Sequence, residues 1–289
     1  KAITSAVRGE APERLVALEA EHGGPLTAGG HELHALLRGD CHSHSDWSDG
    51  GSPIEEMAFT AIELGHEYQV LTDHSPRLRV ANGLSAERLQ RQLGVVDAVN
   101  EHLSAAGGAF TLLKGIEVDI LDDGSLDQTD DMLVQLDLRV ASVHSKLRMD
   151  AAPMTHRMVE AAKNPFTNVL GHCTGRMVMG ARGTRPPSEF DARAVFEACL
   201  EHDTAVEINS RPERQDPPTR LLELARDIGC LFAIDSDSHA PGQLDMLDHG
   251  CARAQAAGIE PERIVNTWPR ERPLAWANPG RSGAGGGGR

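Results

Sequence analysis

Short apolar runs rich in β-branched residues recur along the chain, and segments with helical periodicity separate most of them. The apolar runs lie at 39–43, 68–72, 111–116, 138–143, 168–170, 204–208 and 230–234. The helical segments lie at 53–63, 85–103, 155–162, 191–201, 219–228 and 244–257. Strands that alternate with helices predict parallel β/α units. Seven such units in series favour a closed or nearly closed α/β barrel over an open sheet.

The first helix carries a start signal in the sequence. Ser52 is expected as its N-cap, Pro53 as its first helical residue and Glu55 at the capping-box position. The connection between the third and fourth strands has a weaker helical pattern and contains the turn Asp122-Asp123-Gly124.

The two ends of the chain depart from this pattern. A helical stretch at 12–21, with Leu15 and Leu18 on one side, precedes a segment rich in Gly and Pro. Residues 1–37 are therefore expected to be a lead-in helix and linker, and residues 38–269 to form one domain. The residues after 269 are mainly Pro, Arg, Gly and Ala, a composition that predicts a disordered tail at 270–289.

The composition of the chain disfavours several classes of function. The net charge of -15 opposes binding to nucleic acid and to acidic membranes. No apolar run approaches the roughly 20 residues of a membrane span, and no signal peptide is recognisable. The five cysteines form no CxxC pair and predict reduced thiols in the cytoplasm. Cys41 and Cys173 each neighbour a histidine; buried packing is favoured for them over metal ligation.

The segment 39–50 carries the first chemical signal. His42 and His44 lie two residues apart, so a strand places both rings on one face. Asp40, Asp46 and Asp49 stand close by. Imidazole suits Zn, Fe or Mn, and additional carboxylates favour hard metals that serve hydrolysis.

Similar residues follow almost every predicted strand. They are His42, His44 and Asp49; Asp73 and His74; Glu117; His144; His172; Glu207 and Asn209; and Asp235, Asp237 and His239. A barrel brings the carboxyl ends of its strands to one rim, so these side chains should converge. Six histidines exceed what one ion uses, which predicts two or three ions. Clustered cations bind phosphate oxygens and activate water, which indicates hydrolysis.

The ordered motifs resemble the polymerase and histidinol phosphatase (PHP) superfamily. The likeness is strongest to the PHP domain that follows the polymerase core in bacterial family X DNA polymerases, and it covers about 38–268. This chain contains no polymerase core. The motifs are Asp-x-His-x-His with Ser-Asp-Gly, Thr-Asp-His-Ser, Gly-Ile-Glu, Ser-Val-His-Ser, Gly-His-x-Thr-Gly-Arg and Asp-x-His. The resemblance implies a distorted seven-stranded β/α barrel with a trinuclear centre of Zn, Mn or Fe.

The resemblance also implies how the ligands are shared among three divalent ions. The first ion would be held by His42, His44, Asp237 and Glu117, the second by Glu117, His144 and His172, and the third by Asp49, His74 and His239. Glu117, Asp237 and His239 are the expected catalytic residues, with a metal-bridging hydroxide as the nucleophile. The family usually has an apolar residue at 41 and proline at 173, and both are cysteine here.

Other polar residues are expected around this centre. Asp73 and Asp235 are candidates to orient a histidine ring. Lys146, Arg148, Arg176 and Arg211 are candidates to hold a phosphate, and Arg176 is favoured because it lies within a matched motif. Asn209 and Glu207 are expected either to position substrate or to fill the mouth of the barrel.

We therefore predict a metal-dependent phosphoesterase, either a phosphatase or a phosphodiesterase. The charge of -15 favours a small phosphomonoester such as histidinol phosphate, and the resemblance favours nucleic-acid 3′ ends. A 3′–5′ exonuclease of DNA repair is the main alternative. An amidohydrolase and a non-catalytic, metal-stapled scaffold are the others. The expected partner is a phosphate-ester substrate, without a membrane, and the expected state is a monomer.

Overall fold

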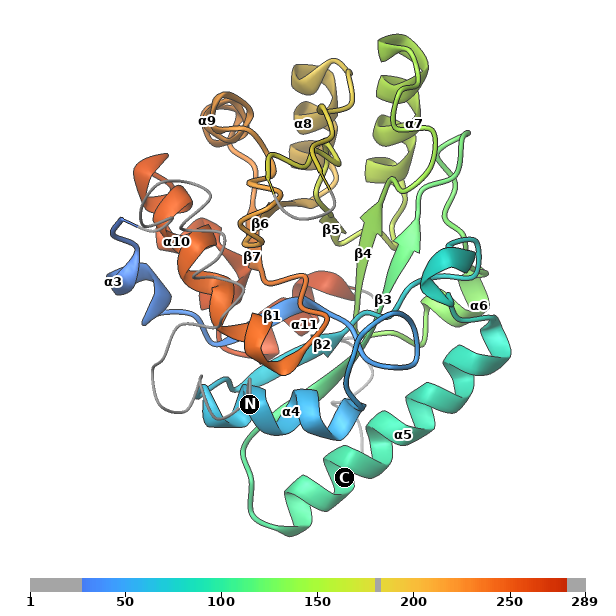
Figure 1. The fold of residues 1–289 in the computed structure, drawn as a ribbon, viewed down its shortest axis with the longest axis vertical. Helices are drawn as coiled ribbons and strands as arrows, with labels where there is room; N and C mark the ends of the chain where they lie inside the picture. The colour runs from blue at the N-terminus through green and yellow to red at the C-terminus, as the bar shows by residue number, and fades with distance from the viewer. Residues whose placement is uncertain (1–27, 180–182, 280–289) are drawn as a thin grey trace, which may run out of the picture.

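Seven parallel strands form the centre of the molecule in a computed structural model that describes residues 28–179 and 183–279 (Figure 1). They pair in sequence order from β1 to β7, each with the next. The predicted nearly closed α/β barrel is thereby confirmed. The strands are β1 (Gly39–Ser43), β2 (Tyr68–Leu71), β3 (Thr111–Asp119), β4 (Leu138–Ser142), β5 (Val169–Leu170), β6 (Ala205–Asn209) and β7 (Phe232–Asp235).

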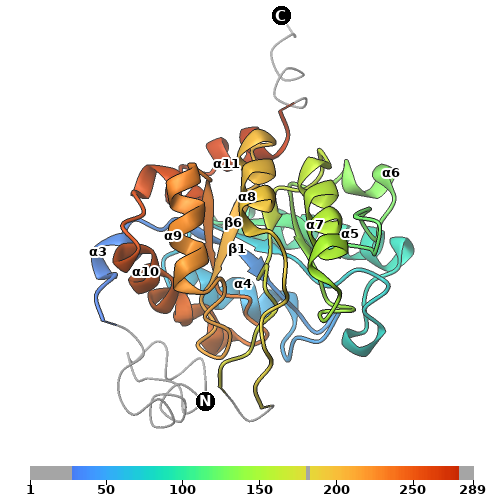
Figure 2. The same ribbon diagram turned by 90° about the horizontal axis from the view of Figure 1, so that it is seen from above.

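Helices surround the strands when the molecule is seen from above (Figure 2). The longer ones are α4 (Ile54–Glu63), α5 (Ala86–Ala105), α7 (Ala151–Lys163), α8 (Ala192–Glu201), α9 (Thr219–Ile228) and α10 (Leu247–Ala256). The shorter ones are α3 (His31–His34), α6 (Asp130–Leu133) and α11 (Glu271–Ala277), with 3₁₀ turns η1 (Arg79–Ala81), η2 (Pro241–Met246), η3 (Pro261–Arg263) and η4 (Val265–Thr267). No helix of the described ranges is both long and apolar enough to cross a membrane. Monomeric state and cytoplasmic location stay predictions.

Helix starts follow local chemistry, with one difference from expectation. Ser85 caps α5 by accepting a hydrogen bond from the Arg88 backbone. At α4 the predicted Ser52 cap is wrong, because Pro53 occupies the N-cap position with extended backbone angles. The Ser52 carbonyl instead accepts a bond from the Asp46 backbone at 2.9 Å, which closes the loop after β1.

Both ends of the domain extend further than predicted. Residues 28–37 are not a free linker, because Leu33 of α3 is buried and the Gly30 amide donates to Gln255 at 2.6 Å. Residues 270–279 are not a disordered tail, because α11 buries Ala277 and Asn278 bonds the Asp137 carbonyl at 2.7 Å. Apolar side chains within a tail of low complexity supply this anchor. The predicted helix at 12–21 and residues 280–289 lie outside the described residues.

The barrel interior changes character along its axis. Its lower part is apolar and is filled by side chains such as Val70, Val140 and Val169. Towards the carboxyl ends of the strands, the fully buried residues become polar, among them His42, Glu117, Glu207 and Asp235. Burying charged groups is costly unless they are paired or bound to metal, so the polar side chains at this end of the barrel need partners or a ligand.

Candidate metal centre

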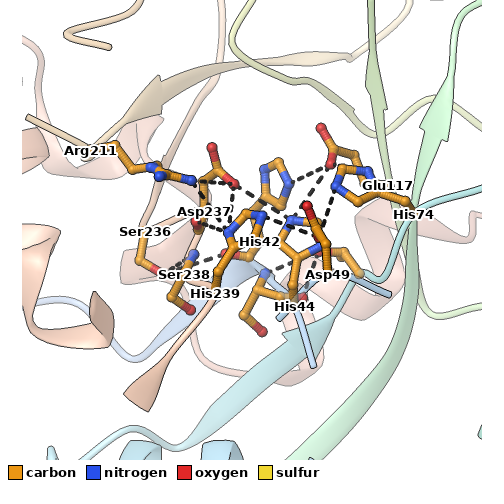
Figure 3. A network of polar contacts seen from close by, with 12 residues as sticks. His42, His44, Asp49, His74, Glu117, Arg211, Ser236, Asp237, Ser238 and His239 are labelled. Atoms are coloured by element: carbon orange, nitrogen blue, oxygen red, sulfur yellow. Dashed lines mark hydrogen bonds and ion pairs between the residues drawn. The ribbon is translucent and has the colours of Figure 1, made fainter. Parts of the chain in front are cut away.

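The nine side chains predicted to bind metal all lie at one end of the barrel, and Figure 3 labels all of them except His144 and His172. They reach it from β1, β3 and the loops after β1, β2, β4, β5 and β7. The sequence separates them widely, but parallel strands bring their carboxyl ends to the same rim. The expected convergence of these side chains is therefore found.

The Glu117 carboxylate lies at the middle of the cluster. It is buried, and its two oxygens lie close to ring nitrogens of five histidines. Oε1 is 2.9 Å from Nε2 of His172 and 3.2 Å from Nε2 of His144, and Oε2 is 2.9 Å from Nδ1 of His74, 3.3 Å from Nε2 of His42 and 3.5 Å from Nε2 of His44. A carboxylate placed this way can bridge neighbouring cations.

A second group lies on the solvent side of the cluster. Oδ1 of Asp49 is 3.4 Å from Nε2 of His74 and 3.4 Å from Nε2 of His239. The rings of His44 and His239 lie 4.2 Å apart. Asp49 is 36% exposed and His239 is 20% exposed, whereas Glu117 is 1% exposed. A substrate from solvent would therefore meet this group first.

Asp237 links the cluster to the cations of the rim. Its Oδ1 lies 3.5 Å from Nε2 of His44 and 3.6 Å from Nδ1 of His239. Its Oδ2 lies 3.0 Å from Nε of Arg214. The residue has a φ of 49°, an unusual value for an aspartate and one that occurs at functional sites.

The polar atoms of the cluster fit cation binding better than a hydrogen-bond network. Within the described residues, both oxygens of Glu117 and buried ring nitrogens of His42, His44, His74 and His172 have no hydrogen-bond partner. Such atoms are costly to leave unpaired, and imidazole with carboxylate is a donor set for Zn or Mn.

Three sets of these atoms are compact enough to hold an ion. They are His44, Asp49, His74 and His239; His42, His44 and Glu117; and His74, Glu117 and His144. In each set the ligand atoms lie within 4.8 Å of one another. His172 and Asp237 stand outside these sets, although each has an oxygen or nitrogen within 3.5 Å of a member.

Opposite charges in the cluster shift the pKa values of its carboxylates and of His42 against the effect of burial. Burial alone would raise the pKa of Glu117, but His144, His42 and His74 hold it well below its usual range. Burial likewise opposes protonation of His42, and the carboxylates of Glu117 and Glu207 nevertheless raise its pKa well above the usual range. The pKa of His44 is lowered by burial and by its neighbours His239 and His74. The cluster thus keeps its carboxylates ionised.

Two carboxylates orient histidine rings from behind. Oε1 of Glu207 lies 2.6 Å from Nδ1 of His42, and its other oxygen accepts a bond from the His172 backbone. Asp119 contacts Nδ1 of His144. The sequence left open whether Glu207 positions substrate or fills the mouth of the barrel, and the structure places it against the ring of His42. Asp119 was missed, although its position two residues after Glu117 puts it on the same strand face.

Among the residues that the structure describes, neither Asp73 nor Asp235 makes a hydrogen bond to a histidine ring, contrary to expectation. Asp73 accepts bonds from the Ser45 backbone at 2.9 Å, from the hydroxyls of Ser45 and Ser48, and from Gln92 at 2.5 Å. It therefore fixes the loop that carries Asp49. Asp235 accepts a bond from the Cys41 backbone at 3.1 Å. Strand parity places a side chain on a face but does not identify its partner.

The predicted phosphate-binding cations differ in where they point. Arg211 approaches the cluster, with Nη1 3.3 Å from Nδ1 of His239 and 3.8 Å from Oδ1 of Asp237 (Figure 3). The Arg176 guanidinium is bound to the carbonyls of Arg214 and Gln215, so it supports that loop instead. Lys146 is exposed and pairs with Asp122, and Arg148 is exposed.

The structure adds Arg214 to the candidates. Its side chain is 14% exposed and contacts Asp237. Burial opposes its charge, but Asp237, Glu117, Asp216 and Glu207 raise its pKa. It lies in the loop after β6, three residues after Arg211, and its place in that loop is the signal that could have identified it as a candidate. Asn209 donates to Asp237 at 3.1 Å and to Glu207 at 3.2 Å, so it ties these carboxylates together.

The two unusual cysteines are fully packed. Cys41 and Cys173 are 0% and 5% exposed, and burial raises the pKa of each thiol well above its usual range. Neither belongs to the three compact ligand sets. Packing is thus the role that their surroundings support.

Comparison with known proteins places this site in context. The family model described as "PHP domain" matches residues 40–228. The chain is 37% identical over 230 residues to the DNA polymerase/3'-5' exonuclease PolX of Bacillus subtilis, of which it spans 39%. It is 27% identical over 242 residues to a protein of Escherichia coli K12 named "Probable phosphatase YcdX", of which it spans 90%.

Solved structures agree on the fold. Histidinol phosphate phosphatase from Lactococcus lactis, complexed with zinc, L-histidinol and phosphate, superposes with a TM-score of 0.55 at 16% identity. The superposition covers 78% of this chain and 95% of that protein. A histidinol phosphatase homologue from Listeria monocytogenes gives a TM-score of 0.52.

Proposed function

The chain belongs to the PHP domain family, and from this premise we propose that it is a metal-dependent phosphoesterase. One observation carries the proposal. The buried Glu117 carboxylate lies within 3.5 Å of ring nitrogens from five histidines, and none of these contacts among the described residues has good hydrogen-bond geometry. A protein that buries this set of donors without a ligand would lose stability. Divalent cations are the ligand that this set fits.

We propose three divalent ions, with Zn, Mn and Fe as the candidates. His42, His44, Asp237 and Glu117 would hold one, Glu117, His144 and His172 a second, and Asp49, His74 and His239 a third. When bound, such cations neutralise phosphate charge and lower the pKa of a water ligand. His44, His74 and Glu117 each belong to two of the three compact ligand sets. Their double use supports a multinuclear centre over one isolated ion.

The chain's own cations would bind the phosphate. Arg211 and Arg214 both lie beside Asp237, at 3.8 Å and 3.0 Å, and Arg211 also contacts His239, which is partly exposed. A guanidinium matches two phosphate oxygens at once and keeps its charge when partly buried. Asp237 and Asn209 would hold these side chains in place. Arg176 would act indirectly, by fixing the loop of Arg214.

A phosphatase or phosphodiesterase with a small substrate is the first choice. Its support is the acidic chain, with a net charge of -15, which disfavours long contacts with a nucleic-acid backbone. The relative named YcdX, which this chain spans almost completely, bears a phosphatase name. The zinc-bound neighbour holds L-histidinol and phosphate, so phosphomonoesters of that size are the first substrates to test.

A 3′–5′ exonuclease is the second choice. It is favoured by the 37% identity to the polymerase and exonuclease of Bacillus subtilis. Because the chain spans 39% of that protein, the two are alike in only one of its parts. Hydrolysis of a phosphodiester at a 3′ end and of a small phosphomonoester both break a phosphorus–oxygen bond. The two substrates differ in the leaving group.

One experiment separates these functions. DNA radiolabelled throughout, single- and double-stranded, is digested beside p-nitrophenyl phosphate and histidinol phosphate, with Mn²⁺ or with EDTA. Free phosphate from the monoesters alone would establish a phosphatase, and progressively shortened DNA an exonuclease. His144→Ala should abolish either reaction, while the exposed His102→Ala should not. Absence of any Mn²⁺-dependent hydrolysis by the wild type would refute the phosphoesterase proposal and favour a scaffold.

A further inference from the structure

The two edge strands of the sheet, β1 and β7, approach each other across a seam. At its upper end the backbones meet directly: Ser43 and Ser238 form a parallel bridge, and the His44 amide donates to the Ser238 carbonyl at 2.8 Å. Below this point the seam is spanned by side chains and by the backbone of residues 264–266. Ile264 forms a parallel bridge with Phe232, and the Arg38 amide donates to the Asn266 carbonyl at 2.8 Å. Seven strands leave the position of an eighth strand empty, so the backbone groups that face the seam need other partners.

Asn266 of η4 fills the lower part of the seam and binds both strands. It is fully buried. Its Oδ1 accepts a bond from the Ile234 amide of β7 at 2.7 Å, and its Nδ2 donates to the Gly39 carbonyl of β1 at 3.2 Å. The same Nδ2 donates to Oδ1 of Asp235 at 3.1 Å. The amide side chain of Asn266 therefore binds one backbone group of each strand across the seam.

Two carboxylates continue the link above Asn266. Asp235 of β7 accepts a bond from the Cys41 amide of β1 at 3.1 Å. In the opposite sense, Asp40 of β1 accepts a bond from the Ser236 amide at 3.1 Å and a bond from the Ser236 hydroxyl. Because Asn266 also binds Asp235, the amide and the first carboxylate form one continuous chain of bonds across the seam.

The metal cluster stands directly above this seam and draws ligands from both sides of it. His42 lies in β1 and His44 in the loop after it, and Asp237 and His239 lie in the loop after β7. Nε2 of His44 lies 3.5 Å from Oδ1 of Asp237, and the ring of His44 lies 4.2 Å from that of His239. A small change in strand separation would alter these ligand distances first.

We propose that Asn266 is a positioning residue of the metal centre: by fixing the separation of β1 from β7, it sets the distance between the ligands on the two strands. This inference rests on the proposed function insofar as it assumes that the cluster binds metal. Asn266 lies within the barrel below the ligands and touches none of them among the contacts described. Its effect would pass through Asp235, Gly39 and Ile234, each of which belongs to or directly neighbours β1 or β7.

A matched residue separates this role from ordinary structural support. Asn100 of α5 also bridges a strand with its amide, since it donates to the Leu112 carbonyl at 2.8 Å and accepts from the Leu112 amide at 2.8 Å. It binds β3 at the outside of the barrel and does not span the seam. Asn100→Ala therefore removes the same number of backbone bonds without changing the separation of β1 and β7.

The test is metal binding by the whole chain, independent of catalysis. Calorimetric titration of the metal-free protein with Mn²⁺ gives affinity and stoichiometry, and visible absorption of the Co²⁺ form reports ligand geometry. Asn266→Ala should weaken binding of the cluster by about tenfold or more and alter the Co²⁺ spectrum, while Asn100→Ala should stay within about twofold of the wild type. Asn266→Ser, which keeps a hydroxyl donor, should lie between Asn266→Ala and the wild type.

The opposite results would overturn the inference. The inference would be wrong if Asn266→Ala kept the Mn²⁺ affinity and the Co²⁺ spectrum of the wild type. It would also be wrong if Asn100→Ala lost as much Mn²⁺ affinity as Asn266→Ala. If Asn266→Ala does not fold, Asn266→Ser is judged by the same two criteria against Asn100→Ser. Failure of the proposed function looks different, because the wild type would then bind Mn²⁺ and hydrolyse no phosphate ester. In that case the metal titration still decides the role of Asn266.

Discussion

Asp119 lies against Nδ1 of His144, and the opposite nitrogen of the same ring, Nε2, lies 3.2 Å from Oε1 of Glu117. The ring is thus held between a carboxylate behind it and the centre of the cluster in front. A carboxylate in this position fixes the ring and its tautomer and increases its basicity as a ligand.

Removing the support of His144 should therefore weaken metal binding. We expect Asp119→Ala to raise the Mn²⁺ concentration for half-maximal activity by about 10- to 100-fold, with a smaller effect for Asp119→Asn. Metal content after gel filtration and Mn²⁺ dependence of p-nitrophenyl phosphate hydrolysis are the measurements. Asp123→Ala, in the exposed turn nearby, is the control. An Asp119→Ala variant with wild-type Mn²⁺ dependence would contradict the role given to Asp119.

Glu117→Gln should be the most damaging conservative change in the cluster. The shape of the side chain is kept, but the charge that faces five histidines is lost. We expect kcat to fall by about 100-fold or more, together with the loss of at least one bound ion per chain. Activity and metal analysis should change together. Glu87→Gln, in the first turn of α5, should change neither, and full metal content in Glu117→Gln would argue against a bridging carboxylate.

Substitutions of Arg214 and of Arg176 should have different effects on kcat/KM. Arg214 lies 3.0 Å from Asp237, whereas Arg176 is bound to backbone carbonyls. We expect Arg214→Lys to lower kcat/KM by about 10- to 100-fold, because lysine cannot match phosphate in a bidentate way. Arg176→Lys should mainly lower the free energy of unfolding, by about 1 kcal/mol. Steady-state kinetics and urea denaturation of both variants test this, and the reverse pattern would restore Arg176 as the phosphate-binding residue.

Arg157 should contribute more to stability than an ordinary arginine. Its fully buried guanidinium donates to the Ser145 carbonyl at 2.9 Å and to the Ile120 carbonyl at 3.1 Å, so it joins the loops after β3 and β4. Arg157→Met would leave both carbonyls unpaired, and we expect a loss of about 2–4 kcal/mol in the free energy of unfolding. Arg193→Met, which removes only an exposed ion pair, should cost less than about 0.5 kcal/mol. Equal costs in urea denaturation would refute the assignment.

His66 should make the fold sensitive to mild acid. Burial and the nearby His34 lower its pKa to about 4. In the unfolded chain the pKa is about 6.5, so between these values the unfolded state binds more protons. Stability should therefore fall as the pH drops from about 6.5 to about 4, with a contribution of about 3 kcal/mol from this residue.

The pH dependence of unfolding isolates that contribution. His66→Gln should lose less stability than the wild type over this range, while exposed His102→Gln should follow the wild type. Urea denaturation at several pH values, without added metal, is the measurement. Parallel curves for the wild type and His66→Gln would show that His66 does not titrate as expected.

The strand pattern was sufficient to predict the barrel and the convergence of the candidate side chains at one rim, and the choice of nine ligands among them came from the family resemblance. That pattern is regular, and the convergence of parallel strand ends is a property of the fold and not of any single residue. Asp119 could have been found from its place on the same strand face as Glu117. The contacts of Arg214 and Asn266 could not be predicted, for another reason. Arg214 depends on the path of the loop after β6, which Arg176 holds, and Asn266 depends on a gap that exists only once β1 and β7 face each other.

The same limit explains Asp73. Its place before His74 made it a candidate to orient a ring, yet its oxygens bind the loop of Ser45 and Ser48. A strand pattern fixes which face a side chain occupies, and the packing of neighbouring loops decides which group it meets. The ends of the domain differ from prediction because α11 is short, and helical periodicity is weak over seven residues.

The seam also has a consequence for how the protein is made. Cys41 and Asp235, which bond across it, are 194 positions apart in the chain. A ribosome releases β1 long before β7. The histidines of β1 are therefore present in the nascent chain before the ligands after β7 have been synthesised. Contacts between distant parts of a chain form late and slowly. A nascent chain would therefore acquire its complete set of metal ligands only near the end of translation, and until then free cations could bind an incomplete site.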